Sequence, residues 1–376
     1  MSFLKSRKWW LMLPLFLIFL GVAYWLIGKI QYRLNVMDIE EYDPISTLKV
    51  EEHQLKKAKY PFIDVHNHQF TMPVQNLDDL VTEMDELNMA IMVNLSGFRG
   101  KYLEWSLENV NEKYGNRFAL FLNIDFEKLD DKGWPDETML MMEEAVAKGV
   151  KGLKVYKSLG LTDKDNDGNR IAVDDPRLNP IWALCAELNI PVLIHTGEPS
   201  AFWSPKDKHN ERWLELKQYP GRYKNPEENP SFEEIMTEQH RMFKNNPNTT
   251  FINAHLGWYG NDLEKLGALM DELPNMYTEL GAVLAELGRQ PFTGREFLIK
   301  YQDRILMGKD AYNKEEYYTY FRVLETQDEY FDYYRKRHAH WKMYGLNLPD
   351  SVLKKIYFQN ALKIIPGLDS TLFEND

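Results

Sequence analysis

The chain has 376 residues, of which 44% are hydrophobic and 13% aromatic, a composition that favours a folded protein over a disordered one. Residues 1–33 hold five Lys and Arg residues and no acid, which leaves 40 basic against 57 acidic residues in the remainder. This acidic balance argues against a nucleic-acid partner. The single cysteine, Cys185, excludes an intramolecular disulfide, and its place on the apolar face of an expected helix favours packing.

The first segment has the composition of a membrane anchor. Residues 9–28 are twenty residues without a charge, about the length that crosses a bilayer as a helix. Basic residues precede them, so the positive-inside bias predicts a cytoplasmic N-terminus. A cleaved signal peptide is the alternative, but this run is longer than usual and lacks a small-residue cleavage site. We expect a single-pass membrane protein: residues 1–33 form the cytoplasmic tip and anchor, residues 34–59 a juxtamembrane linker, and residues 60–376 a periplasmic or extracellular domain.

After the linker, short apolar runs alternate with amphipathic runs, the pattern of parallel βαβ units. Eight runs are expected to be strands, at residues 62–65, 90–95, 118–124, 149–156, 190–195, 250–255, 276–280 and 304–308. Helical patterns occupy residues 77–87, 102–114, 136–147, 178–188, 231–244, 263–273, 293–301 and 352–364. This alternation predicts an α/β fold, a (β/α)8 barrel of the TIM type.

Three long insertions interrupt the alternation, at residues 157–176, 196–230 and 311–348. Each follows the end of an expected strand, the side on which such barrels carry their active sites. The last insertion is dense in Tyr and Phe. It is either an aromatic surface packed on the barrel mouth or a substrate lid.

Four histidines and an aspartate fall at the ends of expected strands. His66 and His68 point to the same side of the first strand because side chains alternate with a period of two. His195 ends the fifth strand, His255 ends the sixth, and Asp310 follows the eighth. One such histidine alone is more often a packing residue. Together, at one end of a barrel, they favour a metal site.

These residues resemble the motifs of the amidohydrolase superfamily, in the group that includes aminocarboxymuconate-semialdehyde decarboxylase and other decarboxylases and hydrolases. The resemblance covers about residues 60–366, including a closing helix at residues 348–361. It implies that one divalent metal ion, with zinc expected, is bound by His66, His68, His195 and Asp310. It also implies that His255 acts on the attacking water as acid and base, and that Asp310 doubles as a proton acceptor.

The resemblance predicts a hydrolase that directs an activated water at a small carbonyl substrate, an amide, ester or lactone. The same ligands would serve a decarboxylase of an unsaturated or aromatic carboxylic acid. An inactive barrel that works as a binding module is a third possibility, against which the intact ligand set argues. A homodimer is left open.

Three basic residues are candidates for contact with the substrate. Lys154 lies on the fourth strand, where binuclear relatives carry a carboxylated lysine, and we expect it to contact an anionic substrate beside a single metal. Arg289 follows the seventh strand and is either a ligand for a substrate carboxylate or a surface residue. Lys309 replaces the family's usual Ser or Thr and predicts an extra cation near the rim.

The loop at residues 163–174 matches the oxygen-ligand spacing of an EF-hand, with acids at positions 1, 3, 5 and 12 and glycine at position 6. A strand rather than a helix is expected before it, and position 12 is Asp rather than Glu. The segment therefore predicts either a calcium site or a glycine-containing hairpin turn.

Overall fold

The computed structural model describes residues 9–374. The chain divides between Val50 and Glu51 into two compact units. Lys5, Arg7 and Lys8, on which the predicted orientation in a membrane depends, lie outside the described residues.

The larger unit is built on eight parallel strands that follow one another around the sheet in chain order. Hydrogen bonds from Val65 N to Met307 O (2.9 Å) and from Asp310 N to His66 O (2.6 Å) bring the last strand back to the first. The predicted (β/α)8 barrel of the TIM type is confirmed, as a nearly closed barrel. Its strands are β1 (Phe62–Asn67), β2 (Met89–Asn94), β3 (Phe118–Asn123), β4 (Gly152–Val155), β5 (Val192–Ile194), β6 (Phe251–Asn253), β7 (Met276–Glu279) and β8 (Ile305–Leu306).

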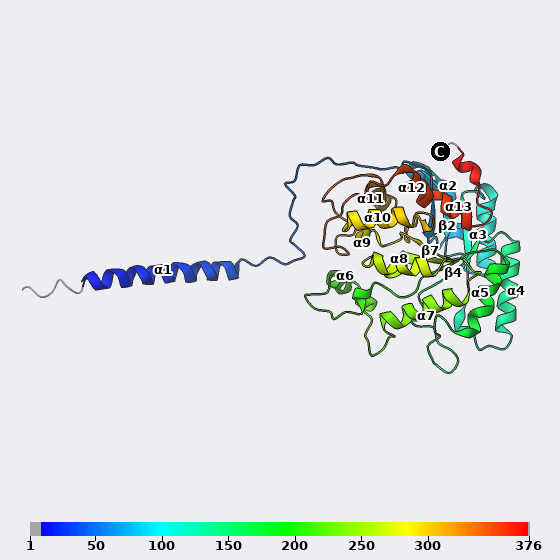
Figure 1. The fold of residues 1–376 in the computed structure, drawn as a ribbon, viewed down its shortest axis with the longest axis horizontal. Helices are drawn as coiled ribbons and strands as arrows, with labels where there is room; N and C mark the ends of the chain where they lie inside the picture. The colour runs from blue at the N-terminus through cyan, green and yellow to red at the C-terminus, as the bar shows by residue number, and fades with distance from the viewer. Residues whose placement is uncertain (1–8, 375–376) are drawn as a thin grey trace, which may run out of the picture. The chain divides into compact units, whose positions relative to one another are not determined.

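Helices cover the outside of the strands (Figure 1). Every residue of β1, β3 and β4 is buried, as expected for strands that face a packed barrel interior on one side and helices on the other. Side-chain caps begin several of the helices: Asn76 accepts from Asp78 N and Ser231 accepts from Glu234 N. The covering helices are α2 (Leu77–Leu87), α3 (Gly100–Lys113), α4 (Trp134–Ala147), α5 (Asn179–Glu187), α7 (Phe232–Asn245), α8 (Leu263–Glu272) and α10 (Pro291–Lys300).

Most boundaries differ from the predictions by a few residues, and two differences are specific. Strand β4 begins at Gly152 rather than Gly149, because Gly149 adopts a φ of +112° and Val150 N caps α4 through a hydrogen bond to Ala145 O (3.1 Å). The predicted final helix contains a π-helical stretch, Lys355–Gln359, between α12 (Asp350–Lys354) and α13 (Asn360–Ile364).

Segments at the barrel mouth contain helices that the sequence does not predict. Two lie in the insertions, α6 (Trp213–Gln218) after β5 and α11 (Lys314–Glu325) after β8, and a third, α9 (Leu284–Gly288), follows β7. Tyr317, Tyr320 and Phe321 of α11 are fully buried, so these aromatic residues pack on the barrel. The insertions also touch one another, with His338 Nδ1 3.4 Å from Glu215 Oε1.

The smaller unit contains α1 (Trp9–Leu34), which continues beyond the predicted end at Gly28. An 18-residue window within Met12–Leu34 has a mean hydropathy of 2.0, and the side chains along this segment are exposed. At about 1.5 Å per residue, this helix is long enough to cross a hydrocarbon core of about 30 Å. A signal sequence has the same features.

Residues 51–59, which the sequence assigns to the linker, contact the barrel. His53 donates from its backbone N to Asp328 Oδ2 (2.7 Å), and Ala58 N donates to Leu87 O (3.1 Å). This stretch therefore forms part of the barrel unit.

Candidate metal centre

The four histidines and the aspartate singled out by the sequence meet at the carboxyl end of the barrel. Ligand atoms of His66, His255 and Asp310 all lie within 4.8 Å of one another. His68 Nε2 is 3.5 Å from Asp310 Oδ1, and His195 Nδ1 is 3.3 Å from His255 Nε2. The structure thus brings all five residues into one cluster, although they follow four different strands.

The hydrogen bonds of two imidazoles determine where His195 keeps its lone pair. His255 Nδ1 contacts the carbonyl oxygen of Gly281 (2.7 Å), and because a carbonyl only accepts, Nδ1 is the donor. In a neutral ring, His255 Nε2 is then the acceptor, so His195 Nδ1 donates to it. The lone pair of a neutral His195 is therefore on Nε2.

A similar argument applies to His66. Its Nδ1 donates to Glu279 Oε1 (2.9 Å), which leaves the lone pair on Nε2. The Nε2 atoms of His66 and His195 are buried and have no hydrogen-bond partner within residues 9–374. Buried nitrogen lone pairs beside a carboxylate fit a bound cation, and a set of imidazoles with one carboxylate suits an ion such as zinc.

The protonation states of the cluster also suit a cation. Burial, with the nearby charge of Lys154, lowers the pKa of His66 well below its usual value and that of His68 to about 4. Burial is also the main reason why the pKa of His195 lies well below its usual value, and the nearby His255 is the second reason. Burial opposes ionisation of Asp310, but the neighbouring histidines bring its pKa to about 2. At neutral pH these imidazoles are neutral and the carboxylate is charged, the forms that bind metal ions.

A strained turn presents His255. The residues from His255 to Trp258 have φ values of 60°, 51°, 57° and 58°, and only Gly257 among them is a glycine. The left-handed conformation costs a residue with a Cβ roughly 1–2 kcal/mol. Asp310, at φ 85°, is also left-handed. Such strain concentrates at functional sites, where the surrounding structure compensates for it.

Glu279, at the end of β7, supports both His66 and His255 and was not anticipated. It is fully buried, and its Oε1 accepts from His66 Nδ1 (2.9 Å) and from the backbone N of His255 (2.7 Å), while Oε2 accepts from Gly281 N. A Cβ atom at Gly281 would lie 2.7 Å from Glu279 Oε2, so the glycine makes room for the carboxylate. The available signal in the sequence was an acid at the end of an apolar strand.

Lys154 lies close enough to this cluster for its charge to affect the pKa values of the histidines, as its position in the sequence suggests. Its side chain is buried, and Nζ has no hydrogen-bond partner in the described part of the chain. Burial lowers the pKa of Lys154 to about 7, although Asp310 and Glu279 oppose this shift. The amine lies 5.5 Å from the centroid of the Tyr156 ring and is available for a hydrogen bond that no described residue provides.

Two other basic residues are already paired. Arg289 binds Glu211 (2.8 Å) and Glu286, and its guanidinium lies 4.0 Å from the ring centroid of Trp341. Lys309 is buried and binds Glu316, so the predicted extra cation near the rim is wrong. Burial lowers the pKa of Lys309, and Glu316 opposes that shift.

The loop at residues 163–174 forms a hairpin turn. Lys164 and Arg170 make an antiparallel bridge, and Gly168 occupies the left-handed position at φ 83°. Asp165 accepts from the backbone N of Asn169 (2.8 Å), and Asp174 binds Arg241 (2.6 Å). Two of the four predicted acidic ligands, Asp165 and Asp174, are used within the turn or in an ion pair, which favours the hairpin interpretation over a calcium site.

Known proteins match the barrel region. The family model described as "Amidohydrolase" matches residues 128–366, more than half of the chain. No curated protein matches the chain. Three solved structures share the fold at low sequence identity, each with a TM-score of 0.51.

Two of these three structures are decarboxylases, and the third is a putative amidohydrolase. A 2,6-dihydroxybenzoate decarboxylase complexed with 2,6-dihydroxybenzoate is 15% identical and aligns over 84% of this chain and 99% of its own. A putative amidohydrolase from Staphylococcus aureus is 15% identical, over 81% and 99%. A dihydroxybenzoic acid decarboxylase from Polaromonas sp. JS666, with bound manganese and the inhibitor 2-nitroresorcinol, is 14% identical, over 84% and 97%. The family match covers β4 to β8 and three of the five clustered residues, and the chain belongs to the amidohydrolase family.

Proposed function

We propose that this chain is a membrane-anchored hydrolase that uses one divalent metal ion, zinc by its donor set, to cleave a small amide, ester or lactone. The observation that carries the proposal is the convergence of His66, His255 and Asp310 within 4.8 Å, beside the unpartnered Nε2 of His195. A divalent ion held there would lower the pKa of water to about 7 and would polarise a carbonyl.

The residues of the chain have distinct roles in this proposal. His66, His68, His195 and Asp310 hold the ion. The hydrogen bond from Nδ1 to Gly281 O orients the ring of His255, and its Nε2 takes a proton from the attacking water once the hydrogen bond from His195 Nδ1 is released, then returns the proton to the leaving group. Asp310, which carries a charge at neutral pH, is a second proton acceptor. Lys154, with its unpartnered amine, binds a negative group of the substrate.

A decarboxylase of an unsaturated or aromatic acid is the second candidate. Rings surround one predicted ligand, because Phe70 and Tyr156 stack on His68 with centroid distances of 5.7 and 5.8 Å. An aromatic substrate would extend this stack, and Lys154 would offer a cation to its carboxylate.

Product analysis separates the two candidates. The purified full-length chain, loaded with zinc or manganese, is given amides, esters, lactones and unsaturated carboxylates, and the products are identified by mass spectrometry. Hydrolysis products without carbon dioxide support the hydrolase, whereas carbon dioxide release supports the decarboxylase. In the same screen, Lys154→Met is expected to raise KM for carboxylate-bearing substrates alone. An equal rise for neutral substrates would contradict the assigned contact.

The proposed localisation rests on α1, on the basic residues that precede it in the sequence, and on the acidic character of the remaining chain. We expect the N-terminus to be cytoplasmic and the barrel unit to be outside the cytoplasm. A periplasmic reporter such as alkaline phosphatase, fused at about residue 40, should be active. An active cytoplasmic reporter at that position would contradict the orientation, and a mature N-terminus after Gly28 would identify a cleaved signal peptide.

A further inference from the structure

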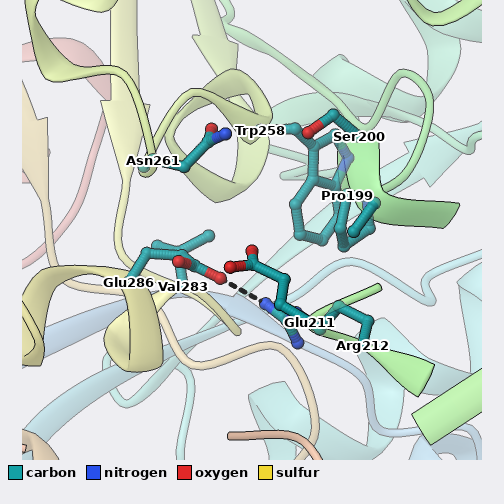
Figure 2. A pocket seen from close by; sticks show the side chains of 10 residues that line it. Pro199, Ser200, Glu211, Arg212, Trp258, Asn261, Val283 and Glu286 are labelled. Carbon is teal, nitrogen blue, oxygen red and sulfur yellow. Dashed lines mark hydrogen bonds and ion pairs between the residues drawn. The ribbon is translucent and has the colours of Figure 1, made fainter. Parts of the chain in front are cut away.

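Two adjoining cavities lie beside the metal cluster and have no role in the chemistry described so far. The inner cavity has a volume of about 20 Å³ and is lined by Ser200, Arg212, Trp258, Asn261 and Glu286, among others (Figure 2). The outer cavity, of about 420 Å³, shares Ser200 and Asn261 with the inner one. Because they share a wall, a ligand in the inner cavity can extend into the outer one.

The inner cavity adjoins the cluster through Trp258. The Trp258 ring stacks on His255, with a centroid distance of 4.5 Å, and lies 5.6 Å from the ring of His195. On another side the cavity is lined by Val283, two residues beyond the Gly281 carbonyl that orients His255. Trp258 therefore forms part of the wall of this cavity and also contacts two histidines of the cluster.

The wall of the inner cavity contains two buried donors without acceptors. Trp258 Nε1 and Arg212 Nε have no hydrogen-bond partner in the described chain, and Arg212 is only 5% exposed. An indole or guanidinium N–H donates but never accepts, so the missing partner of each is an oxygen or another acceptor. Because a buried donor without a partner is unfavourable, both groups favour a ligand that supplies one.

The charges of the walls are balanced. Arg212 binds Glu286 (2.6 Å, the dashed line in Figure 2) and Glu215 (2.9 Å), and Arg289 binds Glu211 (2.8 Å). A substrate carboxylate would have to displace one of these buried or half-buried partners. The remaining lining of the outer cavity includes neutral hydroxyl, amide and imidazole groups, from Ser200, Ser204, His209, Asn210 and Asn261. The lining thus suits a neutral group that makes many hydrogen bonds.

We propose that these cavities form a subsite for a neutral, oxygen-rich portion of the substrate, which carries hydroxyl or amide groups. Its oxygens accept from Trp258 Nε1 and from Arg212 Nε, and the rest lies against the serine and asparagine side chains of the outer cavity. The inference rests on the proposed function because it assumes that the reacting carbonyl is at the metal cluster. It adds that the part of the substrate beyond that carbonyl is polar and uncharged.

Binding can be measured without turnover, on the metal-free and the metal-loaded full-length chain in detergent. The probes are glucitol for hydroxyl groups, N-acetylglycinamide for amide groups and glutarate for an anion of similar length. Calorimetry gives the affinities. The indole N–H resonance of Trp258, identified by its loss in Trp258→Phe, reports contact at the inner cavity.

At least one neutral probe is expected to bind and to shift the Trp258 resonance, and its affinity should fall about five- to tenfold in Trp258→Phe and in Asn261→Ala. Asn116→Ala, which changes an exposed amide bonded to Asp369, is the matched control and should leave affinity unchanged. The preferred probe distinguishes a polyol from an amide. Glutarate binding more tightly with the same sensitivity to Asn261→Ala, or no shift of Trp258 with any probe, would overturn the proposal. Binding in a chain that hydrolyses nothing would leave the subsite standing and refute only the proposed function.

Discussion

His66→Ala and His195→Ala are expected to abolish metal binding and activity together, because each removes a buried Nε2 lone pair that no other group of the described chain engages. His255→Asn is expected to keep the metal and to slow turnover by about a hundredfold or more, the usual scale of a lost acid or base. Metal analysis and rates on the same preparations check both results.

The outcome for His255 decides between two roles, since its ligand atom also lies within 4.8 Å of those of His66 and Asp310. Loss of the ion in His255→Asn would make His255 a ligand and not the base. His240→Asn is a matched control. His240 is another largely buried histidine whose Nε2 is unpartnered within residues 9–374, and burial lowers its pKa to about 4, but it lies on α7 beside Tyr259. This control should change neither metal content nor rate.

Glu279→Gln is expected to weaken metal binding by about ten- to a hundredfold, the usual effect of losing a carboxylate that orients a metal-binding histidine. The carboxylate accepts from His66 Nδ1 and from two backbone N–H groups, whereas an amide has only one oxygen with which to accept. One of the three donors therefore faces an NH2 group. Titration of metal into the purified variant measures the loss.

A general loss of stability would imitate this result, so a control is needed. Glu238→Gln changes another buried carboxylate, which binds Arg170 (2.6 Å) away from the cluster. Both substitutions are expected to lower the unfolding temperature, but only Glu279→Gln should change metal affinity. Equal metal affinity in the two variants would show that Glu279 is a structural residue.

The sequence predicts the barrel and the composition of the metal cluster because both depend on local patterns. Strand and helix periodicities identify the eight units, and a parallel barrel brings all strand ends to one face, so His66, His195, His255 and Asp310 could be assigned to one site from their positions alone.

The details that tune the cluster depend on contacts between loops, which local patterns do not encode. Glu279 contacts His66 because β7 places the two side chains together. The residues next to Glu279 in the sequence do not predict that contact. The left-handed turn at His255 is imposed by the surrounding structure on residues that locally disfavour it. Arg289 and Lys309 can be recognised as basic residues in the sequence, but their partners cannot. In the folded chain Arg289 binds Glu211, and Lys309 binds Glu316 of α11.

The most direct test of the account is the metal content of the purified full-length chain, measured by elemental analysis before and after chelation. The account predicts one divalent ion per chain, loss of activity with the ion, and recovery of both on adding zinc. Two ions per chain that disappear in Lys154→Ala would instead establish a binuclear site bridged by a modified lysine. A chain that binds no divalent ion with its five clustered residues intact would contradict the metal-dependent mechanism itself.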